Sequence, residues 1–204
     1  MHLLFITTHN LGTNPRIVKE VQLAVNEGYE VTLVCFTFNN WSRMNHEEIK
    51  KTLKNKITLI EIPGNRKPFL PWLMSTIVFE GARLLLNILP DNSALLSWAC
   101  NKRSWLLNEH LKRLDKKYDW VIAHNIGAFY PALNLAQKNG ARMGIDLEDY
   151  HPGETTIPKE IRRSEKLIKH ILPNADYVTA ASPLILEEYK KLVSLDSDEL
   201  FSQG

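Results

Sequence analysis

Hydrophobic and polar positions follow two alternating patterns along the chain. Short, nearly continuous apolar runs predict strands that are buried on both faces. These runs lie at residues 3–7, 29–36, 57–62, 120–123, 141–146 and 177–180. Apolar residues at helical spacing predict helices over 15–27, 127–138, 158–171 and 183–192. This alternation predicts an α/β fold: a doubly wound, mostly parallel Rossmann-like sheet with helices on both faces.

One long segment, about 63–117, does not fit this alternation. Its prolines separate two apolar stretches, which predict helices over about 72–89 and 93–116 and hence a helical insertion in the sheet fold. The segment is also the basic part of the chain, with nine Lys/Arg against four Asp/Glu, whereas residues 118–204 hold nine against thirteen.

The first helix of this insertion is apolar enough to raise the question of a membrane. Glu80 and Arg83 lie near its centre, and each would cost roughly 2.5–3.5 kcal/mol at mid-bilayer, which argues against a spanning helix. Two interpretations stay open. The insertion is a hairpin packed in the core, or it is a surface that makes peripheral membrane contact through about 66–103, where Trp72 and Phe79 lie near basic residues.

Composition sets a few further bounds. The chain has 204 residues, enough for one large domain or two small ones, and its net charge of +2 argues against a nucleic-acid partner. The two cysteines, Cys35 and Cys100, make no metal spacing, and Cys35 lies in an apolar run typical of a small core residue. The first residues, MHLLFITT, lack a basic region and a cleavage site, so we predict no signal peptide and a cytoplasmic location.

Polar residues gather where three of the predicted strands end. In an open parallel sheet, ligands bind in the crevice beyond the carboxyl ends of the strands, so these clusters are candidates for a site. After the first strand come His9, Asn10, Gly12, Thr13, Asn14 and Arg16; after the strand at 120–123 come His124, Asn125 and Gly127; at the end of the strand at 141–146 come Asp146, Glu148, Asp149, Tyr150 and His151.

Each cluster also has a purely structural interpretation. Asn14 and Pro15 are explained as the start of a helix, and Gly12 as part of the turn before it. Arg16 could pair with a neighbouring helix, and His124 could be a hydrogen-bonded structural histidine. The residues alone leave both interpretations open.

Several site classes are disfavoured by the sequence. The acidic residues after the strand at 141–146 are metal-ligand types without a recognised metal spacing, so no metal site is predicted. The sequence contains no GxGxxG or GxxxxGK[ST] loop for a dinucleotide or nucleotide phosphate, and no GxSxG nucleophile turn.

Four sequence blocks, taken in order, resemble the N-terminal domain of retaining GT-B glycosyltransferases of the family-4 type. The blocks are GTNPRIVKEVQLAVNEGYEVTLVCF, DWVIAHNIGAFYPALNLAQKNGARM, IDLEDYHPGE and ADYVTAASPLILEEYKK. Two positions depart from the family pattern: Ile122 stands at the first histidine of its H-A-H block, and Glu148 stands where a D-x-H-E block often has histidine.

The resemblance implies transfer of a sugar from a nucleotide-sugar to an acceptor hydroxyl, with retention at the anomeric carbon. It implies a glycan or lipid-linked acceptor of the cell-envelope polysaccharide type, and an enzyme peripheral to the inner face of the membrane. His124 would hydrogen-bond the donor sugar as the catalytic residue. The implied substrate-binding residues are Gly12, Thr13, Asn14, Arg16, Asn125, Asp146, Glu148 and Asp149.

Members of this family have a second Rossmann-like domain that binds most of the nucleotide-sugar. Residues 1–204 would then be a single acceptor-side domain, with the donor-binding domain absent from it, and we expect it to be inactive alone. No cofactor or metal is expected, because the nucleotide-sugar is a co-substrate. Two other hypotheses remain: a non-catalytic Rossmann-like binding or interaction module, and an NAD-dependent enzyme, which the missing glycine fingerprint disfavours.

Overall fold

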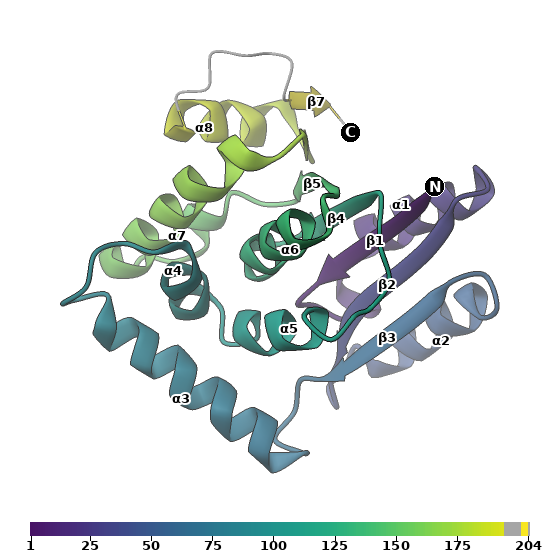
Figure 1. The fold of residues 1–204 in the computed structure, drawn as a ribbon, viewed down its shortest axis with the longest axis horizontal. Helices are drawn as coiled ribbons and strands as arrows, with labels where there is room; N and C mark the ends of the chain where they lie inside the picture. The colour runs from purple at the N-terminus through teal and green to yellow at the C-terminus, as the bar shows by residue number, and fades with distance from the viewer. Residues whose placement is uncertain (194–200, 204) are drawn as a thin grey trace.

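The computed structural model describes residues 1–193 and 201–203, and its strands form one parallel sheet in the order β3-β2-β1-β4-β5-β6-β7 (Figure 1). The strands are β1 (His2–Thr7), β2 (Glu30–Thr37), β3 (Thr58–Pro63), β4 (Trp120–His124), β5 (Arg142–Leu147), β6 (Tyr177–Ala180) and β7 (Phe201–Gln203). The predicted α/β Rossmann-like fold is confirmed. From β1 the strands are added first on one side, as β2 and β3, and then on the other side, beginning with β4. Ligands bind in doubly wound sheets at such a switch in strand order, here between β1 and β4.

The helices cover both faces of this sheet. They are α1 (Pro15–Asn26), α2 (Arg43–Leu53), α3 (Phe69–Leu85), α4 (Ser93–Cys100), α5 (Ser104–Leu111), α6 (Ile126–Asn139), α7 (Pro158–Ile171) and α8 (Pro183–Val193). One core, under α1, joins Phe5 of β1 to Ile17 and Val21, while a larger core on the other face joins Leu4 and Ile6 to α5, α6 and α7. Strand β1 is buried on both sides because its alternate side chains enter the two cores.

The helical insertion differs from the prediction. The second predicted helix, 93–116, is interrupted at 101–103 and forms the two short helices α4 and α5, whose Leu96, Leu107 and Leu111 are buried in the larger core. Helix α3 instead lies along the outside of the molecule (Figure 1). The core interpretation therefore fits α4 and α5, and an exposed surface remains only at α3. Among the described residues no helix is long and apolar enough to cross a membrane.

Two elements were missed by the sequence patterns. Helix α2 was not predicted because it is strongly polar and buries only His46 and Leu53, so it presents little apolar periodicity. The short strand β7 was not predicted either, and it extends the sheet beside β6. By contrast the predicted start of α1 is confirmed: the Asn14 side chain accepts a hydrogen bond from the backbone N–H of Ile17 at 3.1 Å, and Pro15 is the first helical residue.

Candidate functional site

Arg16 and Asp146, which are 130 residues apart in sequence, meet at the carboxyl edge of the sheet. Arg16 Nε donates to Asp146 Oδ2 at 2.7 Å and its Nη2 donates to Oδ1 at 2.6 Å, a bidentate ion pair. The Thr179 hydroxyl of β6 adds a third donor, 2.7 Å from Oδ1. Asp146 is buried at the end of β5, so these three hydrogen bonds compensate its charge.

His124 completes this network from the end of β4. Its side chain is fully buried, with Nδ1 3.1 Å from Glu148 Oε1 and 3.4 Å from Asp146 Oδ2, and Nε2 3.1 Å from Glu20 Oε2. Burial by itself lowers the pKa of His124, but the hydrogen bonds to Glu148 and Glu20 and the nearby Asp146 charge outweigh it and raise that pKa to about 9. At neutral pH His124 is therefore an imidazolium that donates from both ring nitrogens.

Asn125 ties the end of β1 to the end of β4. Its φ of 63° and ψ of 154° lie in a region that is used almost only by glycine, and its side chain is buried. Its Nδ2 donates to Thr7 Oγ1 at 2.6 Å, while its Oδ1 accepts from Thr8 Oγ1 at 2.6 Å. Asn125 thus holds the ends of β1 and β4 together at the carboxyl edge of the sheet.

The loop after β1 packs against α2. A Cβ on Gly12 would lie 2.6 Å from the Ser42 carbonyl oxygen, so glycine is needed here for close packing. Thr13 is exposed, and its hydroxyl lies 3.0 Å from Asn10 Oδ1, to which it donates. The structure thus brings Arg16, His124, Asp146 and Glu148 into one network, and it places Gly12, Thr13, Asn14 and Asn125 in the two loops beside it.

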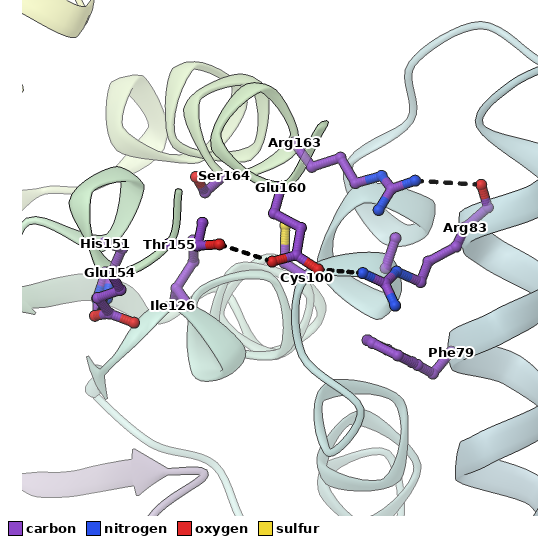
Figure 2. Close-up of a pocket in the computed structure, with 11 residues that line it drawn as sticks. Phe79, Arg83, Cys100, Ile126, His151, Glu154, Thr155, Glu160, Arg163 and Ser164 are labelled. Atoms are coloured by element: carbon purple, nitrogen blue, oxygen red, sulfur yellow. Dashed lines mark hydrogen bonds and ion pairs between the residues drawn. The ribbon is translucent and has the colours of Figure 1, made fainter. Parts of the chain in front are cut away.

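A cleft of about 210 Å³ opens beyond the ends of β4 and β5, between α3, α4 and the start of α7 (Figure 2). Asp149 is exposed and does not line it. Arg83 forms an ion pair with Glu160 across the cleft, and its guanidinium stacks over the Phe79 ring at 4.7 Å. The lining residues are Phe79, Arg83, Ala99, Cys100, Ile126, His151, Glu154, Thr155, Glu160, Arg163 and Ser164.

His151 and Glu154 form a hydrogen-bonded pair in this cleft. His151 Nδ1 lies 2.5 Å from Glu154 Oε1, and that hydrogen bond lowers the pKa of Glu154. His151 is buried, and among the described residues its Nε2 has no hydrogen-bond partner. If Nδ1 carries the proton donated to Glu154, Nε2 keeps a lone pair that can accept a ligand hydroxyl.

His9 interacts electrostatically with both the His124 network and the His151 cleft. Burial lowers the pKa of His9, and the Arg103 charge lowers it further. The charges of Glu148 and of Glu154 in the cleft oppose this shift. A neutral His9 at the end of β1 is therefore a second imidazole at this edge. The sequence analysis assigned no role to His9, His151 or Glu154, although the two histidines lie in its strand-end clusters. The one signal for a paired His151 and Glu154 was their spacing of three residues, which places them on one short helical turn.

Two groups of side chains have metal-ligand types among the described residues, one at His46, Glu47 and Glu61 and one within the His124 network. Ligand atoms of Glu20, His124 and Asp146 lie within 4.8 Å of one another. Both oxygens of Asp146 already accept hydrogen bonds from Arg16, and the imidazolium of His124 has no lone pair to give. These residues do not fit a metal ion, because two internal cations already balance their carboxylates.

The fold is similar to one half of several solved GT-B glycosyltransferases. No protein-family model matches the chain, and no curated protein matches its sequence. Phytolacca americana UGT2, solved with UDP-2-fluoro-glucose and pterostilbene, matches 99% of the chain with a TM-score of 0.55 and 9% identity, over 52% of its own length. LpCGTa, solved with UDP, matches 99% with a TM-score of 0.57 and 9% identity, over 52% of its length.

A bacterial neighbour gives the same result. Anabaena HepE, solved with UDP and glucose, matches the whole chain with a TM-score of 0.55 and 13% identity, over 43% of its length. The chain thus spans about half the length of these structures. At such low identity the similarity shows a GT-B-type fold.

Proposed function

We propose that this chain is the acceptor-side half of a GT-B glycosyltransferase, which transfers a sugar from a nucleotide-sugar to an acceptor hydroxyl. One observation carries the proposal. A cleft with convergent polar groups lies at the carboxyl edge of the sheet, beside the β1/β4 reversal, in a chain whose fold matches half of several UDP-bound glycosyltransferases.

In this proposal His151 Nε2 accepts a hydrogen bond from the acceptor hydroxyl. Glu154 holds the ring in the tautomer that leaves this nitrogen free, and the Tyr189 hydroxyl fixes the His151 backbone by accepting its N–H at 3.1 Å. The acceptor hydroxyl is thereby oriented for transfer at the edge where the sheet reverses.

His124 would act toward the donor sugar. Its Nε2–H is held by Glu20, whose side chain is 30% exposed and can rotate into solvent. A sugar hydroxyl would then replace the Glu20 carboxylate, while Glu148 and Asp146 keep the imidazolium charged and in place. Arg16 positions Asp146 in this arrangement and does not contact the ligand directly.

The rest of the chemistry lies outside these residues. We infer that a second domain binds most of the nucleotide-sugar, that transfer is metal-independent and retaining as in family-4 enzymes, and that the chain alone is inactive. The acceptor we propose is a glycan or lipid-linked intermediate of cell-envelope polysaccharide synthesis.

The outer face of α3 supports a peripheral contact with an anionic membrane. Exposed apolar residues recur along this face at helical spacing, and Arg66 and Lys67 lie just before the helix. The residues are Leu70, Met74, Ile77, Leu84 and Leu85, with Ile88 just after the helix ends. The apolar row would enter the interface while the basic residues meet lipid phosphates, which places the acceptor cleft beside the bilayer.

A non-catalytic binding module is the second candidate. The observation that favours it is the internal pairing of the charged network, since Arg16 and both nitrogens of His124 already have carboxylate partners. Such a module would bind an acceptor through the cleft without any transfer.

The test uses the whole protein that carries this chain. It is incubated with a panel of radiolabelled nucleotide-sugars and a membrane extract as the source of acceptor, and transfer of label to lipid or polymer is measured. We expect transfer that His151→Gln reduces about 10²-fold, the lower end of the range for a lost acid–base group. Lys117→Gln, a surface change at the opposite edge of the sheet, should leave the rate unchanged. Absence of transfer from every donor would favour the binding module.

A further inference from the structure

Helix α3 and the turn at 101–103 enclose a second cleft of about 350 Å³, beside the ends of β2 and β3. It shares Phe79 and Cys100 with the first cleft, so the two are adjacent. Its walls combine Phe36, Trp72, Phe79 and Leu106 with Asn101, Lys102 and Arg103.

Within the described part of the chain, the cations of this cleft have no carboxylate partner. Arg103 is partly buried, and its guanidinium stacks 4.4 Å from the centre of the Phe38 ring. Lys102 Nζ lies 4.5 Å from the Trp72 ring centre, and the Arg66 guanidinium lies 5.1 Å from the same ring. Over residues 1–193 none of these three side chains has a carboxylate within 4.0 Å or donates a hydrogen bond to a protein acceptor.

Burial and mutual repulsion both act on the cations of this cleft. Burial lowers the pKa of Arg103, and burial together with the Arg103 and Arg66 charges lowers the pKa of Lys102. Two other partly buried cations of this fold are paired, Arg16 with Asp146 and Arg83 with Glu160. The Arg103 guanidinium has no protein acceptor among the described residues, so its donors face water, and a bound anion would replace that water with charge-assisted hydrogen bonds.

We propose that Lys102 and Arg103, with Arg66 at the rim, form a subsite for a phosphate or diphosphate ester carried by the acceptor. The planar guanidinium suits bidentate binding of phosphate oxygens, and Lys102 adds a point charge. Trp72 and Phe79 offer apolar contact for the group next to the phosphate. The identity of the ligand as an acceptor rests on the proposed function, since its hydroxyl would lie in the adjacent His151 cleft.

The first experiment titrates the 204-residue chain with inorganic pyrophosphate by isothermal calorimetry. We expect saturable binding at one site, weakened about tenfold or more by Arg103→Gln and by Lys102→Gln, the loss typical of one charge-assisted hydrogen bond. Lys117→Gln removes an equal charge on the far edge and should bind like the parent chain. No saturable binding, or equal weakening by all three variants, would overturn the proposal.

Folding and lipid are controlled separately. Arg103 packs on Phe38, so thermal unfolding is measured for each variant, and Lys102→Gln and Arg66→Gln repeat the test without loss of that contact. A parallel arm measures cosedimentation with phosphatidylcholine–phosphatidylglycerol vesicles. If Arg103→Gln weakens vesicle binding while pyrophosphate does not bind the parent chain, the cations serve bilayer headgroups and the subsite is refuted.

These measurements need neither donor nor second domain. Failure of pyrophosphate binding would remove the phosphate subsite and leave the transferase proposal standing. Failure of sugar transfer with intact pyrophosphate binding would refute the transferase proposal and leave the phosphate subsite standing.

Discussion

The buried imidazolium of His124 predicts a specific dependence of stability on pH. Its pKa rises from 6.5 to about 9 on folding, because the hydrogen bonds to Glu148 and Glu20 outweigh the effect of burial. Because the folded pKa lies above the unfolded value, the stabilisation is fully present below about pH 6.5 and is lost as the pH rises through about 9. The shift corresponds to roughly 3 kcal/mol of unfolding free energy.

The perturbation is His124→Gln, which removes the titrating group and keeps an amide donor. Urea unfolding followed by circular dichroism gives the free energy of unfolding at intervals from about pH 6 to about pH 10. The parent chain should lose roughly 3 kcal/mol more than the variant over this interval. His170→Gln changes an exposed histidine on α7 and should keep the parent's pH dependence.

One result would refute this reasoning. If the difference in unfolding free energy between the parent and His124→Gln is the same at both ends of the pH range, His124 is not a charged group in the folded protein. Its assignment as a double donor, and with it the proposed switch of Nε2 from Glu20 to a donor sugar, would then fail.

Three further predictions concern packing, pairing and the membrane. Asp146→Asn should lower the free energy of unfolding, measured by urea titration, by roughly 2–4 kcal/mol. This is somewhat under the full cost of breaking a buried pair, because the side chain of Arg16 is 29% exposed. A loss under about 1 kcal/mol would contradict the bidentate pairing. Gly12→Ala should cost about 1–3 kcal/mol, because its Cβ meets a carbonyl oxygen, whereas Gly81→Ala on α3 has open space and should cost nothing or stabilise by up to about 1 kcal/mol; similar effects of both would rule out the close packing. Ile77→Glu should reduce cosedimentation with anionic vesicles severalfold and Leu23→Glu, at an equally exposed leucine of α1, should not; equal losses would disprove a specific α3 contact.

The six predicted strands were accessible from local patterns because a strand buried on both faces must be apolar at nearly every position. Leu3 to Ile6 carries this signal directly, and the N-cap at Asn14 is set by residues three apart. The polar strand ends were accessible for a similar reason, since parallel strands bring their carboxyl ends to one edge. Helix α2 escaped prediction because it is strongly polar and buries only His46 and Leu53, so its sequence carries little apolar periodicity.

The chemistry of the edge was decided by tertiary structure. Nothing local to Arg16 indicates that Asp146 neutralises it, and the charge of His124 depends on carboxylates from α1 and from the residues after β5. The cleft beside His151, and the cleft that Lys102 and Arg103 line, exist only because α3 packs against α4 and α5 near the strand ends. Pairing energies and pKa values depend on distances of a few ångströms between residues far apart in the chain, and only the packed fold sets those distances.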